Sequence, residues 1–158
     1  VQSEYSLAVR SPELGLVQAT KQLGTALVAF SPLGRSLLTD RPHTTQKIAT
    51  MGFLKNNPRF IEPNLSANIQ ATAKFRALAE EMGTSAAALS IAWLLHQSEH
   101  IIAIPGTRSV PHFLEHCAGA RLSLSKEAIA QIESVLPVGW AHGDRYSQQQ
   151  WIGPERYC

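Results

Sequence analysis

The sequence has few cysteines, no long apolar run and no block of charges of one sign. Its two cysteines, Cys117 and Cys158, are too few and too far apart for a disulfide scaffold, so we expect a reducing, cytoplasmic setting. The longest apolar stretches fall well short of the roughly 20 residues that cross a bilayer, which argues against a membrane protein. Because the 14 basic and 12 acidic residues are scattered and leave a formal net charge of +2, we expect no nucleic-acid partner.

Signals of metal binding and of nucleophilic catalysis are also missing. His43, His96, His100 and His142 lack the HxxxH or Cys–His spacing of metal sites, so no metal is expected. The sequence contains no G-x-S-x-G elbow, no P-loop lysine pattern and no G-x-G-x-x-G after a strand, which argues against a Rossmann domain. Cys117 lies in a helical pattern, and we interpret it as a packed residue rather than a nucleophile.

The sequence does contain enough apolar material for one domain. Of its 158 residues, 44% are hydrophobic and 16% are charged, which suits a single globular unit with a sizeable core. Short runs rich in β-branched or aromatic residues predict buried strands at 1–7, 26–30 and 101–104. Three parallel strands leave two open sheet edges, so we expect more chain or a partner there, including a homo-oligomer formed through these edges.

Helical patterns alternate with these strands, and this predicts a parallel sheet with right-handed crossovers. The stretch 34–64 is predicted to be an irregular loop, and the tail 138–158, rich in glycine, glutamine and aromatic residues, an extended arm. The predicted helices begin at Ser11-Pro12-Glu13, near Ser66, at Thr84 or Ser85, near Val110 and at Ser125; the first ends near Gly24, the second near Met82, and the fourth near Gly119.

Three segments, in this order, resemble the aldo-keto reductases. Residues 2–7 (QSEYSL) resemble the family's sixth barrel strand, residues 28–34 (VAFSPLG) the seventh strand and its loop, and residues 104–108 (IPGTR) the end of the eighth. The resemblance implies an α/β fold: the C-terminal part, strands 6 to 8 with their helices, of a (β/α)8 TIM barrel. It implies a single partial domain at 1–158 that ends in the tail, with five strands expected upstream and the site at the carboxyl ends of the strands.

The resemblance also implies an activity, the transfer of hydride between NADPH and a small-molecule aldehyde or ketone. In the family, the catalytic Asp, Tyr, Lys and His lie in the upstream part, and none of them maps onto this sequence. No catalytic residue is therefore expected here, and the chain alone is predicted to be inactive. The alternatives are a truncated, non-catalytic NADP(H)-binding remnant or sensor, and an unrelated α/β binding module.

Several residues match positions that hold the nicotinamide half of the cofactor in the family. Gln2 matches the residue whose amide binds the nicotinamide carboxamide, and Phe30 the aromatic residue that stacks on the ring. Without the resemblance, Gln2 reads as an ordinary polar residue at a strand start and Phe30 as core. The turn that wraps the pyrophosphate is matched by Ser31, Pro32, Leu33 and Gly34, and Arg41 is expected either to reach a phosphate or to be solvated.

A second group matches the adenosine half. Gly106, Thr107 and Arg108 lead into a helix, and a helix N-terminus with an arginine is a natural site for the 2′-phosphate of NADP. By resemblance, Glu115 contacts the adenine amino group and His112 faces the adenosine phosphate; the alternative is a solvated helix face. Two positions depart from the family pattern and put cofactor choice in doubt: His116 stands where Asn is usual, and Ser36 stands where Gly is usual.

Overall fold

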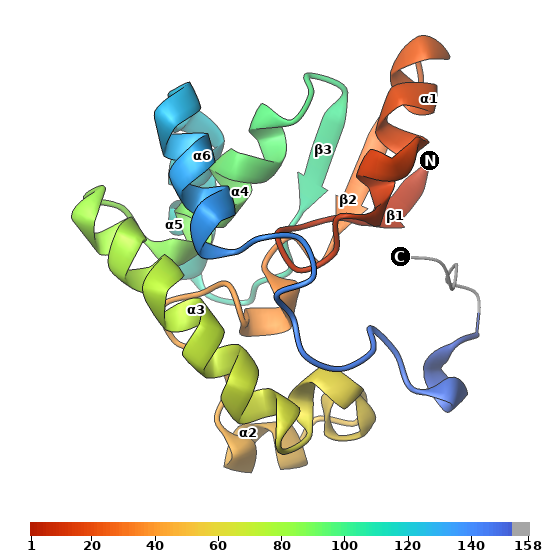
Figure 1. The fold of residues 1–158 in the computed structure, drawn as a ribbon, viewed down its shortest axis with the longest axis vertical. Helices are drawn as coiled ribbons and strands as arrows, with labels where there is room; N and C mark the ends of the chain where they lie inside the picture. The colour runs from red at the N-terminus through yellow and green to blue at the C-terminus, as the bar shows by residue number, and fades with distance from the viewer. Residues whose placement is uncertain (153–158) are drawn as a thin grey trace.

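The computed structural model describes residues 1–152 and shows a three-stranded parallel sheet with helices packed on it (Figure 1). Strands β1 (Gln2–Glu4), β2 (Leu27–Phe30) and β3 (Ile101–Ile104) lie side by side in that order. Both neighbouring pairs are parallel, as predicted. In this part of the chain β1 and β3 are the edge strands, and the expectation that an edge pairs with a second copy stays a prediction.

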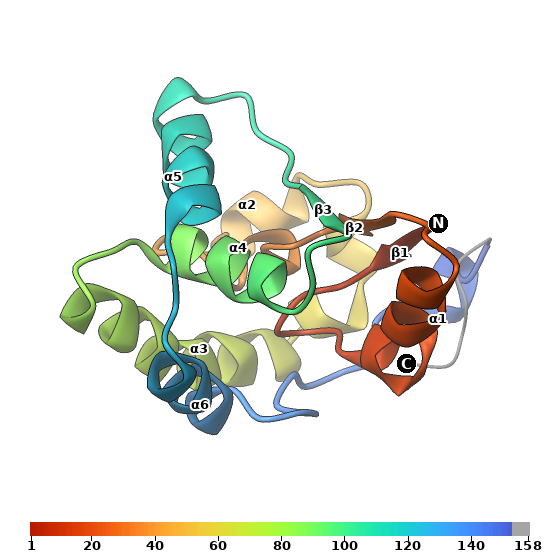
Figure 2. The ribbon, with the colours of Figure 1, turned by 90° about the horizontal axis from the view of Figure 1, so that it is seen from above.

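The helices gather mainly on one face of the sheet. In Figure 2, α4 lies next to the sheet, with α5 above it and α3 and α6 below it, while α1 lies beside β1. Serine side chains begin two of them as predicted: Ser85 accepts a hydrogen bond from the Ala88 amide, and Ser125 from the Ala128 amide. The α-helices are α1 (Leu16–Gln22), α2 (Thr45–Ala49), α3 (Asn64–Glu81), α4 (Ala86–His96), α5 (Val110–Arg121) and α6 (Lys126–Val135).

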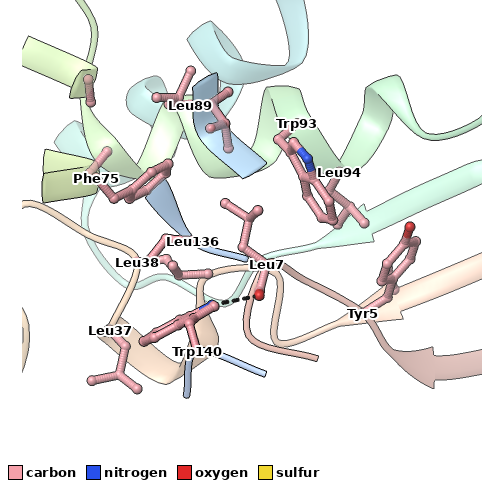
Figure 3. Close-up of a cluster of buried hydrophobic side chains, with 14 of the residues drawn as sticks. Tyr5, Leu7, Leu37, Leu38, Phe75, Leu89, Trp93, Leu94, Leu136 and Trp140 are labelled. Carbon is pink, nitrogen blue, oxygen red and sulfur yellow. Dashed lines mark hydrogen bonds between the residues drawn. The ribbon is translucent and has the colours of Figure 1, made fainter. Parts of the chain in front are cut away.

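The hydrophobic core lies between the helix-facing side of the sheet and helices α3, α4 and α6. Trp93 packs edge-on against Tyr5, with ring centroids 5.9 Å apart. Figure 3 shows Trp140, which follows α6, reaching this core, where its indole Nε1 donates a 2.8 Å hydrogen bond to the Leu7 carbonyl. Fully buried side chains in the cluster include Tyr5, Leu7, Leu27, Leu38, Leu65, Phe75, Leu89, Trp93, Leu94, Ile132 and Leu136.

The first strand and the first helix are both shorter than predicted. Strand β1 ends at Glu4, because the chain turns and the Ser6 and Val9 amides each donate to the other residue's carbonyl, at 3.1 and 3.0 Å. The predicted helix at 11–24 is a 3-10 turn, Ser11–Leu14, followed by α1. Gly15 separates them with a φ of +141°, which a helix does not accommodate.

The prediction of an irregular loop at 34–64 was wrong in part. The segment contains α2, which Thr44 caps by accepting from the Lys47 amide at 3.3 Å, and three 3-10 turns. Helix α3 begins at Asn64 instead of after Ser66. The reason is that the Glu62 carboxylate accepts hydrogen bonds from both the amide and the hydroxyl of Ser66, so a residue before the helix satisfies its first turn.

The tail is a packed segment rather than an extended arm. Trp140, Arg145 and Tyr146 are buried, and a 3-10 turn forms at Gln148–Gln150. Residues 153–158, including Cys158, lie outside the described residues. Within residues 1–152, no helix is long and apolar enough to span a bilayer, and no three His, Cys, Asp or Glu side chains are grouped to hold a metal ion.

Candidate functional site

The candidate site is built at the carboxyl ends of the three strands. Gln2 pairs with Val28, while Phe30 pairs with Glu4 on one side and Ile104 on the other. Because paired residues in a parallel sheet share a face and side chains alternate along a strand, Gln2 and Phe30 lie on the same face. This is the face opposite the helices, so Gln2 is exposed and Phe30 is only half-buried.

The turn after β2 has an unusual backbone. Ser31, Gly34, Arg35 and Ser36 have φ values of +52°, +54°, +54° and +93°, and three of these four residues are not glycine. Such conformations cost about 1–2 kcal/mol each for residues with a side chain, so they persist only where surrounding contacts enforce them. One such contact is the Ser36 hydroxyl, which accepts from the His43 amide at 3.0 Å. The turn is therefore a shaped loop held by its neighbours.

A cavity of about 1070 Å³ lies between this turn, the end of β3 and helix α5. It brings together two groups of predicted residues that are more than 60 positions apart in the sequence. Four predicted residues are not in its lining: Gln2 and Phe30 on the open face of the sheet, Gly34 buried in the turn, and Arg108 exposed before α5. The predicted residues that do line it are Ser31, Pro32, Leu33, Arg41, Gly106, Thr107, His112, Glu115 and His116.

The start of α5 forms one wall of the cavity. Thr107 turns the chain toward the helix by accepting from the Ser109 amide at 3.1 Å. Ser109, the N-cap residue, makes no capping side-chain hydrogen bond, and Pro111 occupies the first turn. Amides of the first turn have no intrahelical partners, so together with the exposed Arg108 they present donors suited to an anion.

His116 lies deeper on the same helix and lacks a partner for its Nδ1 atom. It is 7% exposed, lines the cavity, and makes no hydrogen bond through Nδ1. Burial lowers its pKa, with Glu115 opposing and His112 reinforcing the shift, so the imidazole is neutral at pH 7. A buried polar atom without a partner is costly, which indicates that this wall is shaped to hydrogen-bond a polar ligand.

The opposite wall carries most of the charge. Arg35, Arg41 and His43 line it, and burial together with Lys47 lowers the pKa of His43. Asp40 is the acidic residue of this wall, and its Oδ1 accepts a 3.0 Å hydrogen bond from the Ala86 amide at the start of α4. With two guanidinium groups against one carboxylate already engaged at a helix end, this wall favours an anionic ligand.

A buried ionic cluster at the end of β1 was not predicted. Glu4 is 1% exposed, and its Oε1 lies 2.8 Å from Nη1 of Arg35 while its Oε2 accepts from Nη2 at 3.1 Å. The Tyr146 hydroxyl accepts from Nη2 of Arg35 at 2.8 Å and donates to Oε2 of Glu4 at 3.0 Å. Nε of Arg145 lies 3.7 Å from the same oxygen. One sequence signal was available: a carboxylate in a buried strand requires a cation.

Aromatic rings enclose the arginines of this cluster. The Arg35 guanidinium carbon lies 5.1 Å from the ring centre of Phe53 and 5.0 Å from that of Tyr146. Arg145 lies over Tyr146 and Trp151, at 5.0 and 5.4 Å. Burial, followed by the charge of the neighbouring carboxylate, raises the pKa of Tyr146, so its hydroxyl stays protonated and able to donate.

Comparison with known proteins gives a consistent result. The model of the aldo/keto reductase family matches residues 1–137. The chain is 28% identical over 148 residues to aldo-keto reductase str7 of Strobilurus tenacellus, covering 92% of this chain and 44% of that protein. It is 32% identical over 146 residues to probable aldo-keto reductase 1 of Glycine max, covering 92% and 42%. The chain thus spans less than half the length of these relatives.

Solved structures confirm the predicted fold, a partial TIM barrel. The glycerol dehydrogenase AKR11B4 from Gluconobacter oxydans superposes with a TM-score of 0.70 at 25% identity, covering 85% of this chain and 41% of that one. An aldo/keto reductase from Klebsiella pneumoniae, in complex with NADP and acetate, gives 0.63 at 20% identity, covering 99% and 42%. The thermostable aldo-keto reductase Tm1743, in complex with the inhibitor epalrestat, gives 0.59 at 24% identity, covering 85% and 38%.

Proposed function

Because the chain belongs to the aldo/keto reductase family, we propose that its cavity binds NADP(H) and that the protein transfers hydride between NADPH and an aldehyde or ketone. The observation that carries this proposal is the pairing of two walls across one cavity. The turn after β2 offers arginines and shaped backbone, and α5 offers open helix amides and the unpartnered Nδ1 of His116. A cavity of this size suits a dinucleotide whose two halves are joined by phosphates.

Each group of residues has a defined task in this proposal. Gln2 and Phe30 receive the nicotinamide end, and the aromatic ring covers one face so that only the other face reaches the carbonyl. The turn residues Ser31 to Gly34, with Arg41, hold the pyrophosphate. Arg108 and the start of α5 take the 2′-phosphate, while His112, Glu115 and His116 hold the adenosine. When bound, NADPH supplies the hydride that is added to the carbonyl carbon.

The fit of the cofactor rests on His116. A neutral imidazole with one free ring nitrogen accepts or donates a single hydrogen bond, which is the polarity that an adenine edge offers. Asparagine at this position, usual in the family, carries both a donor and an acceptor. We therefore expect His116 to keep adenine binding while changing its strength.

To test the proposal, the 158-residue chain is titrated with NADPH and NADH while tryptophan fluorescence is followed. We expect saturable quenching with a preference for NADPH. Arg108→Met should weaken NADPH about tenfold and NADH much less, because only NADPH carries the 2′-phosphate that a charge-assisted hydrogen bond would hold. Arg121→Met, an exposed arginine at the far end of α5, is the matched control. Equal binding of the two nucleotides by all three proteins would refute the NADP assignment.

One observation favours a second candidate, a chain that binds NADP(H) without catalysis. Among the described residues, those that line the cavity include neither a tyrosine nor a lysine, so this wall supplies no proton donor of the family's kind for the carbonyl oxygen. The two candidates are separated by following NADPH absorbance after adding an aldehyde. Cofactor binding without NADPH consumption would favour the non-catalytic candidate, and consumption would favour the reductase.

A further inference from the structure

The C-terminal segment 139–151 lies beyond the family match, which ends at residue 137, yet it is tied closely to the body of the chain. Trp140 donates to the Leu7 carbonyl. Asn68 accepts from the His142 amide at 2.7 Å and donates to its carbonyl at 3.0 Å. Asn57, fully buried, donates to the Arg145 carbonyl at 2.8 Å. The path of the segment is therefore fixed before it reaches the candidate site.

At the site, the segment contacts the cavity wall through a chain of polar contacts. Tyr146 accepts from Arg35 and donates to Glu4, so its hydroxyl is the bridge between the two partners of a buried ion pair. Arg145 adds a second positive charge beside the carboxylate. Neither Arg145 nor Tyr146 lines the cavity, whereas Arg35 does. The segment thus acts on the cavity only through Arg35 and its neighbours.

The same segment also holds the second residue that flanks Arg35. The Gln150 amide donates to the Phe53 carbonyl at 2.8 Å, and the Phe53 ring packs edge-on against Tyr146, with centroids 6.0 Å apart. Phe53 lines the cavity and covers one face of the Arg35 guanidinium. Two lining residues, Arg35 and Phe53, are therefore positioned by a segment that does not itself line the cavity.

The geometry of Arg35 explains why this matters for the turn. Its backbone has a φ of +54°, between Gly34 at +54° and Ser36 at +93°. A non-glycine residue does not keep this conformation without restraint, and here the restraint is the fork of its side chain on Glu4. If that fork loosens, we expect the turn to relax toward ordinary backbone and to lose the arrangement of amides that faces the cavity.

We propose that the segment 139–151 is a positioning element for the dinucleotide site, in which Tyr146 and Arg145 hold Glu4 and Arg35 so that the turn 31–36 keeps the shape that receives the pyrophosphate. This inference rests on the proposed NADP(H) function. It makes Tyr146 and Arg145 positioning residues that never touch the cofactor. Their effect is confined to ligands that reach the turn, because the α5 end of the cavity has no contact with the segment among the interactions described.

The test compares two ligands that differ in what they reach. NADPH extends from α5 to the turn, whereas adenosine 2′,5′-bisphosphate carries only the adenosine end. Tyr146→Phe removes the bridging hydroxyl and keeps the ring, so we expect about fivefold weaker NADPH binding and unchanged binding of the bisphosphate, measured by calorimetry. The matched control is Thr20→Val, which removes a 2.8 Å hydrogen bond to His100 at the other end of the sheet. It should leave both affinities unchanged.

A conservative pair at Arg145 gives a second, independent reading. Arg145→Met removes the charge beside Glu4, and we expect at least a tenfold loss of NADPH affinity with the bisphosphate unaffected. Arg145→Lys keeps the charge and should recover part of the loss. Should Arg145→Met fail to fold by circular dichroism, the Tyr146→Phe result decides.

Two outcomes would overturn the inference while sparing the proposed function. One is NADPH binding that is unchanged in Tyr146→Phe, and the other is a parallel loss of both ligands. If the unaltered, folded chain binds neither ligand, the NADP(H) proposal fails first and the inference fails with it.

Discussion

Gly119→Ala tests how closely α5 must approach α4 to form the cavity. A Cβ at Gly119 would lie 2.5 Å from the Ala88 carbonyl oxygen and 2.9 Å from its Cα. Both atoms belong to the backbone of α4, which is buried along nearly its whole length, so α5 has to move instead. Overpacking costs about 3 kcal/mol where backbone must shift, against about 1 kcal/mol gained in helix propensity. We expect a net loss of about 2 kcal/mol in the free energy of unfolding.

The assay is urea unfolding followed by circular dichroism, with NADPH affinity measured on the folded variant. Affinity should also fall, because α5 carries Glu115 and His116. Gly52→Ala is the matched control: a Cβ there meets no atom within 4 Å and the backbone is not left-handed, so its stability should change by less than about 0.5 kcal/mol. A Gly119→Ala protein as stable as the unaltered chain would show that helix propensity outweighs the contact and that the helices are not in close register.

Three further predictions concern stability and pH. Burial lowers the pKa of both His116 and His43 below the ordinary value, so the folded chain binds fewer protons than the unfolded one, and the free energy of unfolding should fall as the pH drops below about 6.5; urea midpoints at several pH values check this, and His116→Asn should flatten the slope. Trp140→Phe leaves the Leu7 carbonyl without its indole partner and should cost about 1–3 kcal/mol in urea unfolding; no change would contradict the buried hydrogen bond. Ser125→Ala removes the side-chain cap of α6 and should lower stability by about 1 kcal/mol, and a change near zero would mean that this end is already frayed.

The order of strands and most helix starts followed from the sequence because their signals are local. The β-branched run at 101–104 and the serine caps at Ser85 and Ser125 act within a few residues. Where the prediction was wrong, the deciding partner lay outside the pattern. Strand β1 ends early because Ser6 pairs with Val9, and α3 starts early because Glu62 replaces a cap within the helix. Single-residue choices of this kind leave little trace in periodicity.

The site divides in the same way. The cavity residues in the turn after β2 and in the start of α5 were predictable, since each set follows the carboxyl end of a strand and parallel strands end at one edge. The cluster around Glu4 was not, because Arg35 is 31 residues away and Tyr146 is 142 residues away. Pairs at such separations leave no spacing pattern in one sequence, and they become visible only when the tail is seen folded across the molecule (Figure 1).

The Glu4–Tyr146 hydrogen bond also places a constraint on synthesis at the ribosome. Glu4 leaves the exit tunnel near the beginning of this stretch of chain, and Arg145 and Tyr146 leave near its end, so the carboxylate stays in water through nearly the whole interval. Closing a loop of this length costs entropy that only the final contacts repay. Elements β2 to α6 therefore have time to assemble first, and a nascent chain interrupted before residue 145 would carry a nearly complete cavity whose turn after β2 had not yet been set.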